Sequence, residues 1–369
     1  SVDGRLRRPS CRYSGAMKTE LIFSTGPGPA FDTFCQGRNY ASVHTLTDSN
    51  TATLALPVLA ASSTLLAEAC NWTMPAGEEN KKLATLSNLW TELESAGATR
   101  RSLLVNIGGG VVTDLGGFAA ATFKRGMDYV NIPTTVLGAV DASFGGKTGI
   151  DFGGLKNQIG TFAAPAATII SDTFFATLPP EQILSGYAEM LKHALLSSSE
   201  ATHKALYFDP VADLASGNML PLLRSSCNVK AGIVAADPHE KGLRKSLNLG
   251  HTAGHAFESL AMRRGKPIPH GYAVAYGMVV ALIISHMKLG MGTGLLYPLA
   301  AYVRSHYGSP GIKCSDYPEL LGFMHSDKKN TAKKTVNFTL LKNAGEPVID
   351  CATSDNDIRT ALDILTDLI

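Results

Sequence analysis

The stretch LLVNIGGGVVTDLGGF, residues 103–118, decides the fold class expected for this chain. It begins with a run typical of a buried strand, turns at three glycines, and continues with apolar residues at helical spacing. Such a turn lets the backbone approach an anion, and the N–H groups of the helix start face it. The spacing is not GxGxxG, so the residues alone fit a phosphate-binding turn and a plain tight connection equally well.

The segments on either side repeat this alternation of strand and helix. Residues 41–48 and 129–135 are typical of strands, and residues 78–97 carry leucines at helical spacing before Gly97. Strands separated by helices predict a parallel sheet with helices on both faces. From Pro179 onward, helical patterns dominate. We expect an α/β domain over residues 17–178 and an all-α domain over residues 179–369, and we interpret residues 1–16 as an added leader.

The composition is that of a compact enzyme. Hydrophobic residues make up 45% and charged residues 17% of the 369 residues, and the net charge is +2 without a dominant basic run. These values argue against disorder, and against nucleic acid or an anionic membrane as a main partner. The longest apolar run, residues 273–287, is shorter than the ~18 residues of a membrane span. Six scattered cysteines without a CxxC pair favour reduced thiols and a cytoplasmic location.

A second candidate ligand site is the glycine-rich stretch VDASFGGKTGIDFGGLKNQIG at residues 140–160. Lys147 and Lys156 lie in it, together with Asp141 and Asn157. The GxxxxGK[ST] spacing of a P-loop is not met. A solvated loop with ordinary surface lysines is the alternative interpretation. The glycine content favours a ligand, because long glycine-rich loops are tolerated mainly where a ligand orders them.

The stretch NLGHTAGHAFE, residues 248–258, places His251 and His255 on one helical face. Such a pair is more often structural than metal-binding when it is taken alone. Glu189 and His270 are two further potential ligands, and a catalytic zinc needs three protein ligands and an open position. The HExxH motif is absent, which argues against a zinc protease of that type.

The segment before this histidine pair is rich in charge. Lys230, Glu240, Arg244 and Asn248 lie upstream of His251. A helix and a loop there can direct several cations at an anionic substrate. Ordinary surface charge explains each of these residues singly.

Together and in order, these motifs resemble the 3-dehydroquinate synthase family of sugar phosphate cyclases. The resemblance runs from about residue 20 to residue 334. It rests on GGGVVTDLGGFAAATFKRG, IPTTVLGAVDASFGGKTGID, LKNQIGTF, SGYAEMLKHAL, GLRKSLNLGHTAGHAFE, HGYAVAYGM and DKKN. It implies a Rossmann-like N-terminal domain that binds NAD, and a helical C-terminal domain that binds Zn²⁺ or Co²⁺. The implied substrate is a sugar acid phosphate, 3-deoxy-D-arabino-heptulosonate 7-phosphate (DAHP), and the implied assembly is a homodimer.

The resemblance also implies roles for single residues. The implied metal ligands are Glu189, His251 and His270, so His255 is expected to face the phosphate and assist proton transfer, together with Glu240 and Lys147. The implied substrate contacts are Arg125, Asp141, Lys147, Asn157, Lys192, Lys230, Arg244, Asn248, His255 and either Lys328 or Lys329. The implied NAD contacts are Asp48, Glu78, Lys81, Gly109, Gly110, Asp114, Thr134, Thr135, Lys156 and Thr177.

Three departures from the family pattern indicate a divergent branch. Thr113 stands where the family usually has glycine, Gly153 and Gly154 replace a proline-containing loop, and Tyr272 replaces an acid. None of them removes an implied ligand-contacting group. The alternatives are a sister cyclase, such as 2-deoxy-scyllo-inosose or aminodehydroquinate synthase, a metal-dependent polyol phosphate dehydrogenase, and an NAD-binding regulatory module without catalysis.

Overall fold

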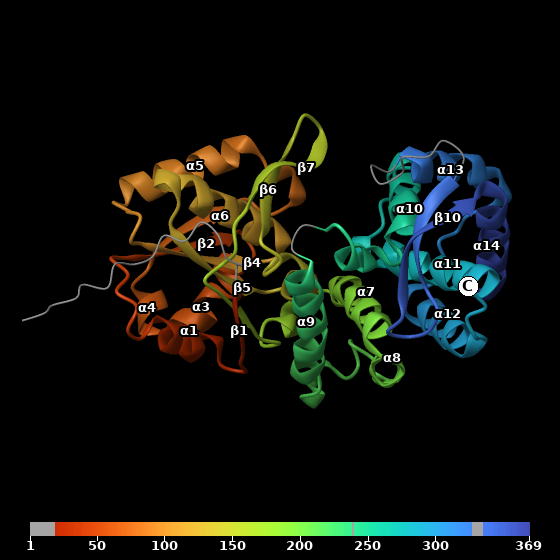
Figure 1. Cartoon of the computed structure of the whole chain (residues 1–369). Coiled ribbons are helices and arrows are strands. Elements are labelled where there is room, and N and C mark those ends of the chain that lie inside the picture. The colour runs from red at the N-terminus through yellow and green to blue at the C-terminus, as the bar shows by residue number, and fades with distance from the viewer. Residues whose placement is uncertain (1–18, 238–239, 327–334) are drawn as a thin grey trace, which may run out of the picture.

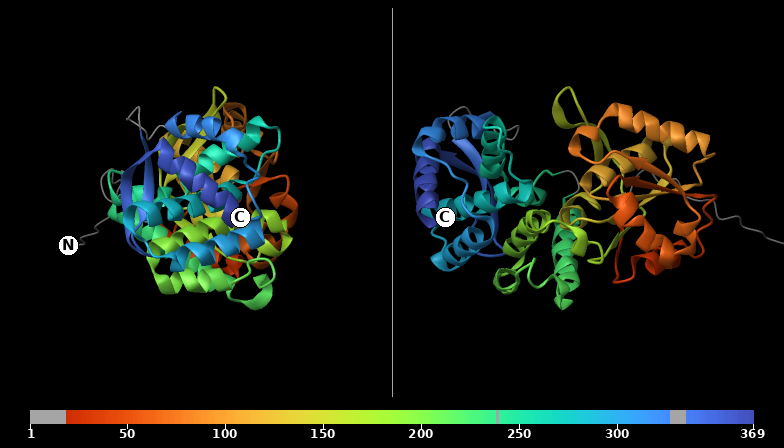
Figure 2. Two further views of the ribbon diagram at one scale, coloured as in Figure 1. Left: turned by 90° about the vertical axis from the view of Figure 1, so that its right-hand side faces the viewer. Right: turned by 180° about the vertical axis from the view of Figure 1, so that it is seen from behind.

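The structure is a computed structural model that describes residues 19–237, 240–326 and 335–369 in two lobes lying side by side (Figures 1 and 2). The first lobe contains a six-stranded sheet in the order β1-β8-β5-β4-β2-β3, and all of its paired strands are parallel. Its strands are β1 (Glu20–Phe23), β2 (Val43–Asp48), β3 (Cys70–Met74), β4 (Leu103–Gly108), β5 (Asp128–Pro133) and β8 (Ala167–Ile170). The parallel sheet predicted from the sequence is confirmed.

Helices cover both faces of this sheet, as the alternating pattern predicts. One apolar cluster joins the sheet to α5 and α6, and a second cluster joins the opposite face to α1, α3 and α4. Each face therefore has its own core (Figure 1). The helices of this lobe are α1 (Pro27–Cys35), α2 (Thr51–Leu54), α3 (Leu56–Ser62), α4 (Thr64–Ala67), α5 (Leu83–Ser95) and α6 (Gly110–Thr122), with short 3₁₀ turns η1 (Glu78–Asn80), η2 (Phe123–Arg125) and η4 (Phe175–Thr177).

The glycine-rich stretch at residues 140–160 is not a loop, in contrast to the sequence prediction. A π-helical turn, η3 (Gly138–Ala142), precedes an antiparallel hairpin of β6 (Lys147–Phe152) and β7 (Leu155–Phe162). Gly153 and Gly154 connect the two strands with φ angles of +61° and +78°. Two successive positive φ angles suit the tight turns of hairpins, so these glycines build the turn and leave the neighbouring lysines on paired strands.

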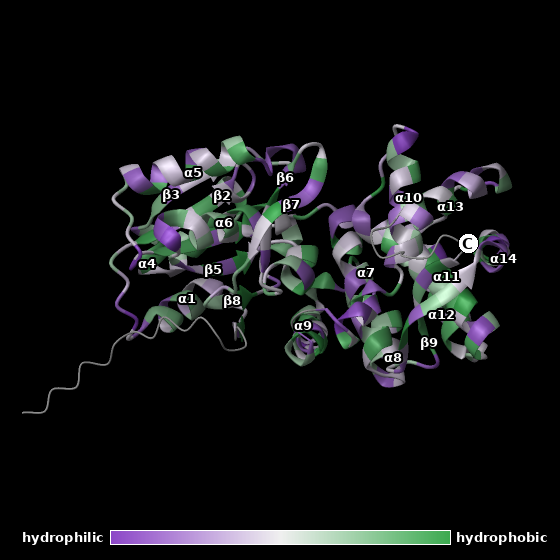
Figure 3. Ribbon diagram, turned by 45° about the horizontal axis from the view of Figure 1, so that its top comes forward, coloured by the Kyte–Doolittle hydropathy of each residue, from purple (hydrophilic) through white to green (hydrophobic). Residues whose placement is uncertain are grey.

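The second lobe is helical, as predicted, but it also contains an antiparallel hairpin of β9 (Thr335–Leu341) and β10 (Pro347–Ser354). The long apolar α11 has the length and composition of a membrane span, but 72% of that window is buried inside the lobe. It packs against α14, whose outer side is polar (Figure 3). The helices are α7 (Pro180–Ser197), α8 (Ser199–Tyr207), α9 (Met219–Ala236), α10 (His251–Arg263), α11 (His270–Leu289), α12 (Thr293–Tyr307), α13 (Tyr317–Ser326) and α14 (Asp355–Leu368), with 3₁₀ turns η5 (Leu214–Ser216), η6 (Leu243–Asn248) and η7 (Cys314–Asp316).

The π-helical turn η3 joins the two lobes. Its buried residues Ala139 and Val140, together with Val136 and Phe144, belong to the apolar core of the helical lobe. The turn packs against α7 and α9 on one side and against α6 on the other. The domain boundary near Leu178 therefore stays a prediction, because the core of the helical lobe extends back to residue 136.

Candidate active site

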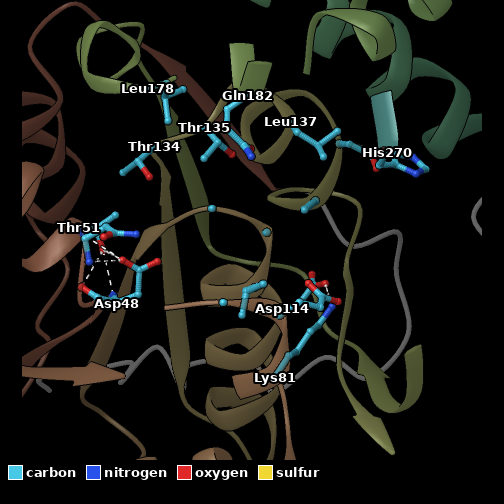
Figure 4. Close-up of a pocket in the computed structure, with 18 of the residues that line it drawn as sticks. Asp48, Thr51, Lys81, Asp114, Thr134, Thr135, Leu137, Leu178, Gln182 and His270 are labelled. Atoms are coloured by element: carbon cyan, nitrogen blue, oxygen red, sulfur yellow. Dashed lines mark hydrogen bonds and ion pairs between the residues drawn. The ribbon is translucent and has the colours of Figure 1, made fainter. Parts of the chain in front are cut away.

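A cavity of about 1100 Å³ lies at the carboxyl ends of the parallel strands; we call it the first cavity. Figure 4 shows Asp48 and Thr51 on one side of it and His270, from the helical lobe, on the other. Ligands bind at this edge of open parallel sheets. All ten residues implied as NAD contacts line this cavity, namely Asp48, Glu78, Lys81, Gly109, Gly110, Asp114, Thr134, Thr135, Lys156 and Thr177.

The glycine turn between β4 and α6 forms one wall of the first cavity. A Cβ on Gly108 would lie 2.6 Å from the Val112 side chain, and one on Gly109 would lie 3.2 Å from Thr135 Cγ2. A side chain would therefore collide at Gly108 and be crowded at Gly109, and the backbone of Gly109 and Gly110 faces the cavity. The first N–H groups of α6 have no partner within the helix, which makes its start a site for a phosphate group.

Asp48 ends β2 at the far side of the first cavity. Its Oδ1 accepts hydrogen bonds from Asn50 N at 2.9 Å, Thr51 N at 2.8 Å and Thr51 Oγ1 at 3.2 Å. These donors fix the carboxylate at the strand end. An acid in this position of a dinucleotide-binding fold accepts hydrogen bonds from the ribose hydroxyls and disfavours a 2′-phosphate.

Lys81 connects the first cavity to the β6–β7 hairpin. Only 4% of its side chain is exposed, and its Nζ lies 2.6 Å from both Asp114 Oδ2 and Asn157 Oδ1. Burial raises the pKa of Asp114 to about 6, although the Lys81 ammonium opposes that rise. Asn157 has a φ of +53° and donates its N–H to Asp151 Oδ1.

A second cavity, of about 510 Å³, adjoins the first and shares Asp114, Asp141, Ala142 and Asn157 with it. Cationic side chains converge on this second cavity from both lobes, and several of them are largely buried. Such a cavity suits an anionic ligand, because several converging cations can bind it through charge-assisted hydrogen bonds. It is lined by the implied substrate residues Asp141, Lys147, Asn157, Lys192, Lys230, Arg244 and Asn248, and by Glu240 and His251.

Two ion pairs give this cavity its shape. Lys230 Nζ, from α9, lies 2.6 Å from Asp141 Oδ1 and also donates to the Asp141 carbonyl. Lys147 Nζ, from β6, lies 3.2 Å from Glu240 Oε2. Both pairs cross from the first lobe to the helical lobe, so they hold the cavity walls together.

Glu189, His251 and His270 form a compact group whose ligand atoms all lie within 4.8 Å of one another. Nε2 of His251 lies 3.2 Å and Nε2 of His270 lies 3.4 Å from Glu189 Oε1. Glu189 is fully buried, and its two oxygens are without hydrogen-bond partners of good geometry in the described structure. Lys192 contacts Oε2 as an ion pair. One carboxylate and two imidazoles, with an incompletely satisfied carboxylate, fit a divalent metal such as zinc.

The second nitrogen of each histidine is also held. His251 Nδ1 lies 3.2 Å from Leu249 O, and His270 Nδ1 lies 3.2 Å from Glu258 Oε2. In the neutral rings, an N–H directed at each of these oxygens would leave both Nε2 lone pairs pointing at Glu189, as metal-binding histidines require. Burial, aided by Lys192, lowers the pKa of His251 to about 4. Burial also disfavours charged His270, but Glu189 and Glu258 raise its pKa to about 10.

Glycines allow the three ligand-bearing helices to approach one another. A Cβ on Gly271 of α11 would collide with the Ser185 backbone of α7, and one on Gly277 would collide with Gly250 at the start of α10. These close approaches bring Glu189 of α7 next to the first residues of α10 and α11. His255 lies one turn further along α10; its ring centroid is 5.5 Å from that of His251, and it lines the first cavity.

One of the implied substrate residues that the structure describes, Arg125, is not brought to the site. Arg125 is exposed at the end of η2 and lines neither cavity, because α6 carries the chain about 20 Å from the glycine turn. Lys328 and Lys329 lie outside the described residues. Conversely, Glu258 was missed as the partner of His270, although its spacing of three residues after His255 placed it on the same helical face.

Two residues that depart from the family pattern, Thr113 and Tyr272, are accommodated by their immediate neighbours. Thr113 Oγ1 donates to Gly110 O at 3.2 Å, so the hydroxyl bonds within α6 and does not enter the first cavity. The Tyr272 ring packs against Tyr307 with a centroid distance of 5.0 Å. Neither residue displaces a group of the site.

Comparison with known proteins agrees with this geometry. Residues 71–185 match the model of the 3-dehydroquinate synthase N-terminal domain, and residues 186–330 match that of the C-terminal domain. The 3-dehydroquinate synthase of Parabacteroides distasonis is 44% identical over 89% of this chain and 93% of its own. That of Listeria innocua is 38% identical over 84% of each chain.

Solved structures show the same fold at low sequence identity. A 2-deoxy-scyllo-inosose synthase complexed with carbaglucose-6-phosphate, NAD⁺ and Co²⁺ has a TM-score of 0.77 and 23% identity, over 94% of this chain and 96% of its own. The 2-epi-5-epi-valiolone synthase of Streptomyces hygroscopicus, with NAD⁺ and Zn²⁺, has a TM-score of 0.78 and 23% identity, over 98% and 99%. Fold, family models and relatives agree, and the chain belongs to the 3-dehydroquinate synthase family.

Proposed function

We propose that this protein is a 3-dehydroquinate synthase that converts DAHP to 3-dehydroquinate and phosphate in the shikimate pathway. Membership of the family and the names of the relatives support this activity. The structural observation that carries it is the position of Glu189, His251 and His270. This group lies where the first cavity, suited to a dinucleotide, meets the second cavity, which is lined by cations.

The second cavity holds the substrate. Lys147, Lys192, Lys230 and Arg244 bind the phosphate and carboxylate through charge-assisted hydrogen bonds. Asp141, Asn157 and Asn248 supply polar contacts to the sugar hydroxyls. Lys192 and Lys230 are nearly fully buried and are held by Glu189 and Asp141, so the cations are in place before the substrate arrives.

Glu189, His251 and His270 hold a divalent metal, zinc or cobalt. When bound, the metal acidifies the hydroxyl to be oxidised and polarises the resulting ketone. The low pKa of His251 keeps its imidazole neutral at pH 7, as a ligand must be. Glu189 and Glu258 raise the pKa of His270 to about 10, so His270 must release its proton when the metal binds. Glu258 orients His270, and Leu249 O orients His251.

The first cavity holds NAD⁺, with a phosphate at the start of α6 and ribose hydroxyls at Asp48. NAD⁺ held there would supply reversible hydride transfer, taking a hydride from the substrate and returning it, so it would not be consumed. Between these two transfers phosphate is eliminated, and ring opening and an aldol closure follow. His255 and Glu240 move protons at the edges of the two cavities, and Lys147 positions Glu240 through their ion pair.

An assay with DAHP, catalytic NAD⁺ and Zn²⁺ tests this function. We expect phosphate release without net accumulation of reduced nicotinamide. Stoichiometric reduced nicotinamide from a polyol phosphate would instead identify a dehydrogenase. Phosphate release from another sugar phosphate, but not from DAHP, would identify a sister cyclase. Binding of NAD⁺ without turnover of any of these substrates would identify a regulatory module.

The assembly and the location are further parts of the proposal. A homodimer and a cytoplasmic location follow from the resemblance and the thiol pattern. Within one chain Arg125 does not reach the second cavity, so its implied substrate contact requires a second copy. Light scattering of the purified protein measures the assembly directly, and a monomer that turns over DAHP would remove Arg125 from the substrate contacts.

A further inference from the structure

A row of buried polar side chains crosses three neighbouring strands of the sheet, β4, β5 and β8. Asn106 of β4 pairs in register with Asn131 of β5, and Asn131 pairs with Thr168 of β8. All three are at least 98% buried. Buried amides and hydroxyls destabilise a core unless they are hydrogen-bonded, so such a row in central strands needs a reason.

The row is connected by hydrogen bonds that all lead to one atom. Asn106 Nδ2 donates to Asn131 Oδ1 at 3.0 Å, and Asn131 Nδ2 donates to Ser143 O at 2.7 Å. Thr168 Oγ1 donates to the same carbonyl at 2.8 Å. Ser143 O accepts only N–H or O–H groups, so the orientation of the Asn131 amide is fixed, and that of Asn106 follows from it.

Ser143 directly follows the π-helical turn η3 and caps its C-terminal end. Its N–H donates to Gly138 O at 3.0 Å, and the other end of the turn is held by Thr135 Oγ1, which accepts from Gly138 N at 3.0 Å. Turns of this kind are rare and occur mostly at functional sites, where surrounding structure holds them. Here the buried row supplies that support from inside the sheet.

The turn η3 contacts both ligand cavities. Asp141 and Ala142 line the first and second cavities alike. A Cβ on Gly110 would lie 3.4 Å from Ala142 Cβ, so the turn rests on the glycine wall, and Asp141 holds Lys230 of the helical lobe. A shift of η3 therefore changes the position of the substrate relative to the cofactor.

We propose that Asn106, Asn131 and Thr168 are positioning residues that fix η3, and with it Asp141, at the distance that hydride transfer between substrate and NAD⁺ requires. The inference rests on the proposed function. The row touches neither ligand, because none of its members lines a cavity. It acts through the carbonyl of Ser143, and removing one donor loosens the turn without removing a ligand contact.

Thr168→Val tests the proposal, because valine keeps the shape and removes only the hydroxyl. We expect kcat to fall by about tenfold to a hundredfold, because misplacement by a fraction of an ångström is costly in hydride transfer. KM for DAHP and Kd for NAD⁺ should stay within about twofold, because no ligand contact is lost. Amide exchange at residues 138–143 should quicken. Thr168→Ser, which keeps the hydroxyl, should restore both kcat and exchange.

The matched control is Thr45→Val on β2. Thr45 is also buried in the sheet and also donates from its hydroxyl, to Asn71 Oδ1 at 2.9 Å, but it lies away from η3. It should lose a similar amount of thermal stability and keep the wild-type kcat. Asn131→Ala serves as a second test at the other donor to Ser143 O.

Wild-type kcat and unchanged exchange in Thr168→Val and Asn131→Ala would overturn the proposal. So would an equal loss of kcat in Thr45→Val, since that would show general destabilisation. The proposed function fails separately, if the wild-type protein releases no phosphate from DAHP. In that case exchange at residues 138–143 still measures whether the row holds the turn.

Discussion

The two cavities of the site differ in the groups that form their walls. One wall of the first cavity is backbone, a glycine turn at the start of α6 that leaves little room for side chains. The second cavity is shaped by charged side chains, several of them nearly fully buried, and it borders the group of Glu189, His251 and His270. Substitutions at this glycine wall should therefore act by steric exclusion, and those in the second cavity by loss of charge or of a metal ligand.

The largest effect is expected at the three proposed metal ligands, Glu189, His251 and His270. His251→Ala should remove the metal and lower kcat at least about a thousandfold, since one of three protein ligands is lost. His255→Ala should keep the metal and lower kcat about a hundredfold, as loss of a proton-transfer group does. Metal content by mass spectrometry and phosphate release measure both variants. A strong chelator should reproduce the His251→Ala result in the wild type, and equal metal loss in both variants would contradict the division of roles.

A smaller effect is expected at the cations of the second cavity. Arg244 is 6% exposed and lines this cavity, whereas its neighbour Lys245 forms an ion pair with Asp350 at the protein surface. Arg244→Met should raise KM for DAHP by about tenfold to a hundredfold, because charge-assisted hydrogen bonds to the substrate are lost. Lys245→Met is the matched control and should leave KM unchanged. A similar KM in both variants would remove Arg244 from the substrate contacts.

The sheet could be predicted from the sequence more fully than the site. Strands such as β4 and β5 can be predicted from their apolar runs, and their parallel pairing follows from the intervening helices. The π-helical turn η3 has no comparable signal, and the glycines of the β6–β7 hairpin suggested a loop. Glu189, His251 and His270 come from three helices, so local spacing offers them only as candidates beside His255, and the resemblance was needed to choose these three. The row from Asn106 to Thr168 depends on strand order, which single strands do not show.

The glycine wall of the first cavity gives a more moderate prediction. Gly108→Ala places a methyl group 2.6 Å from the Val112 side chain, so the start of α6 must shift. We expect Kd for NAD⁺ to rise about tenfold, within the range of overpacking effects, while metal content stays at the wild-type level. Gly294→Ala in α12 is the control, because a methyl group there meets no atom within 4 Å. Loss of metal in Gly108→Ala would show that the two cavities are not built independently.

The smallest effect is expected at Asp48. This acid ends β2 at the first cavity and accepts hydrogen bonds from Thr51. Asp48→Asn keeps an acceptor for the N–H groups of Asn50 and Thr51, but it removes the negative charge. We expect Kd for NAD⁺ to rise about fivefold, because a neutral acceptor binds the ribose hydroxyls more weakly than a carboxylate. Kd for NADP⁺ should fall in the same variant, since the repulsion of a 2′-phosphate is relieved. Isothermal titration with both cofactors measures the ratio. An unchanged ratio would mean that Asp48 holds the strand end and does not face the ribose.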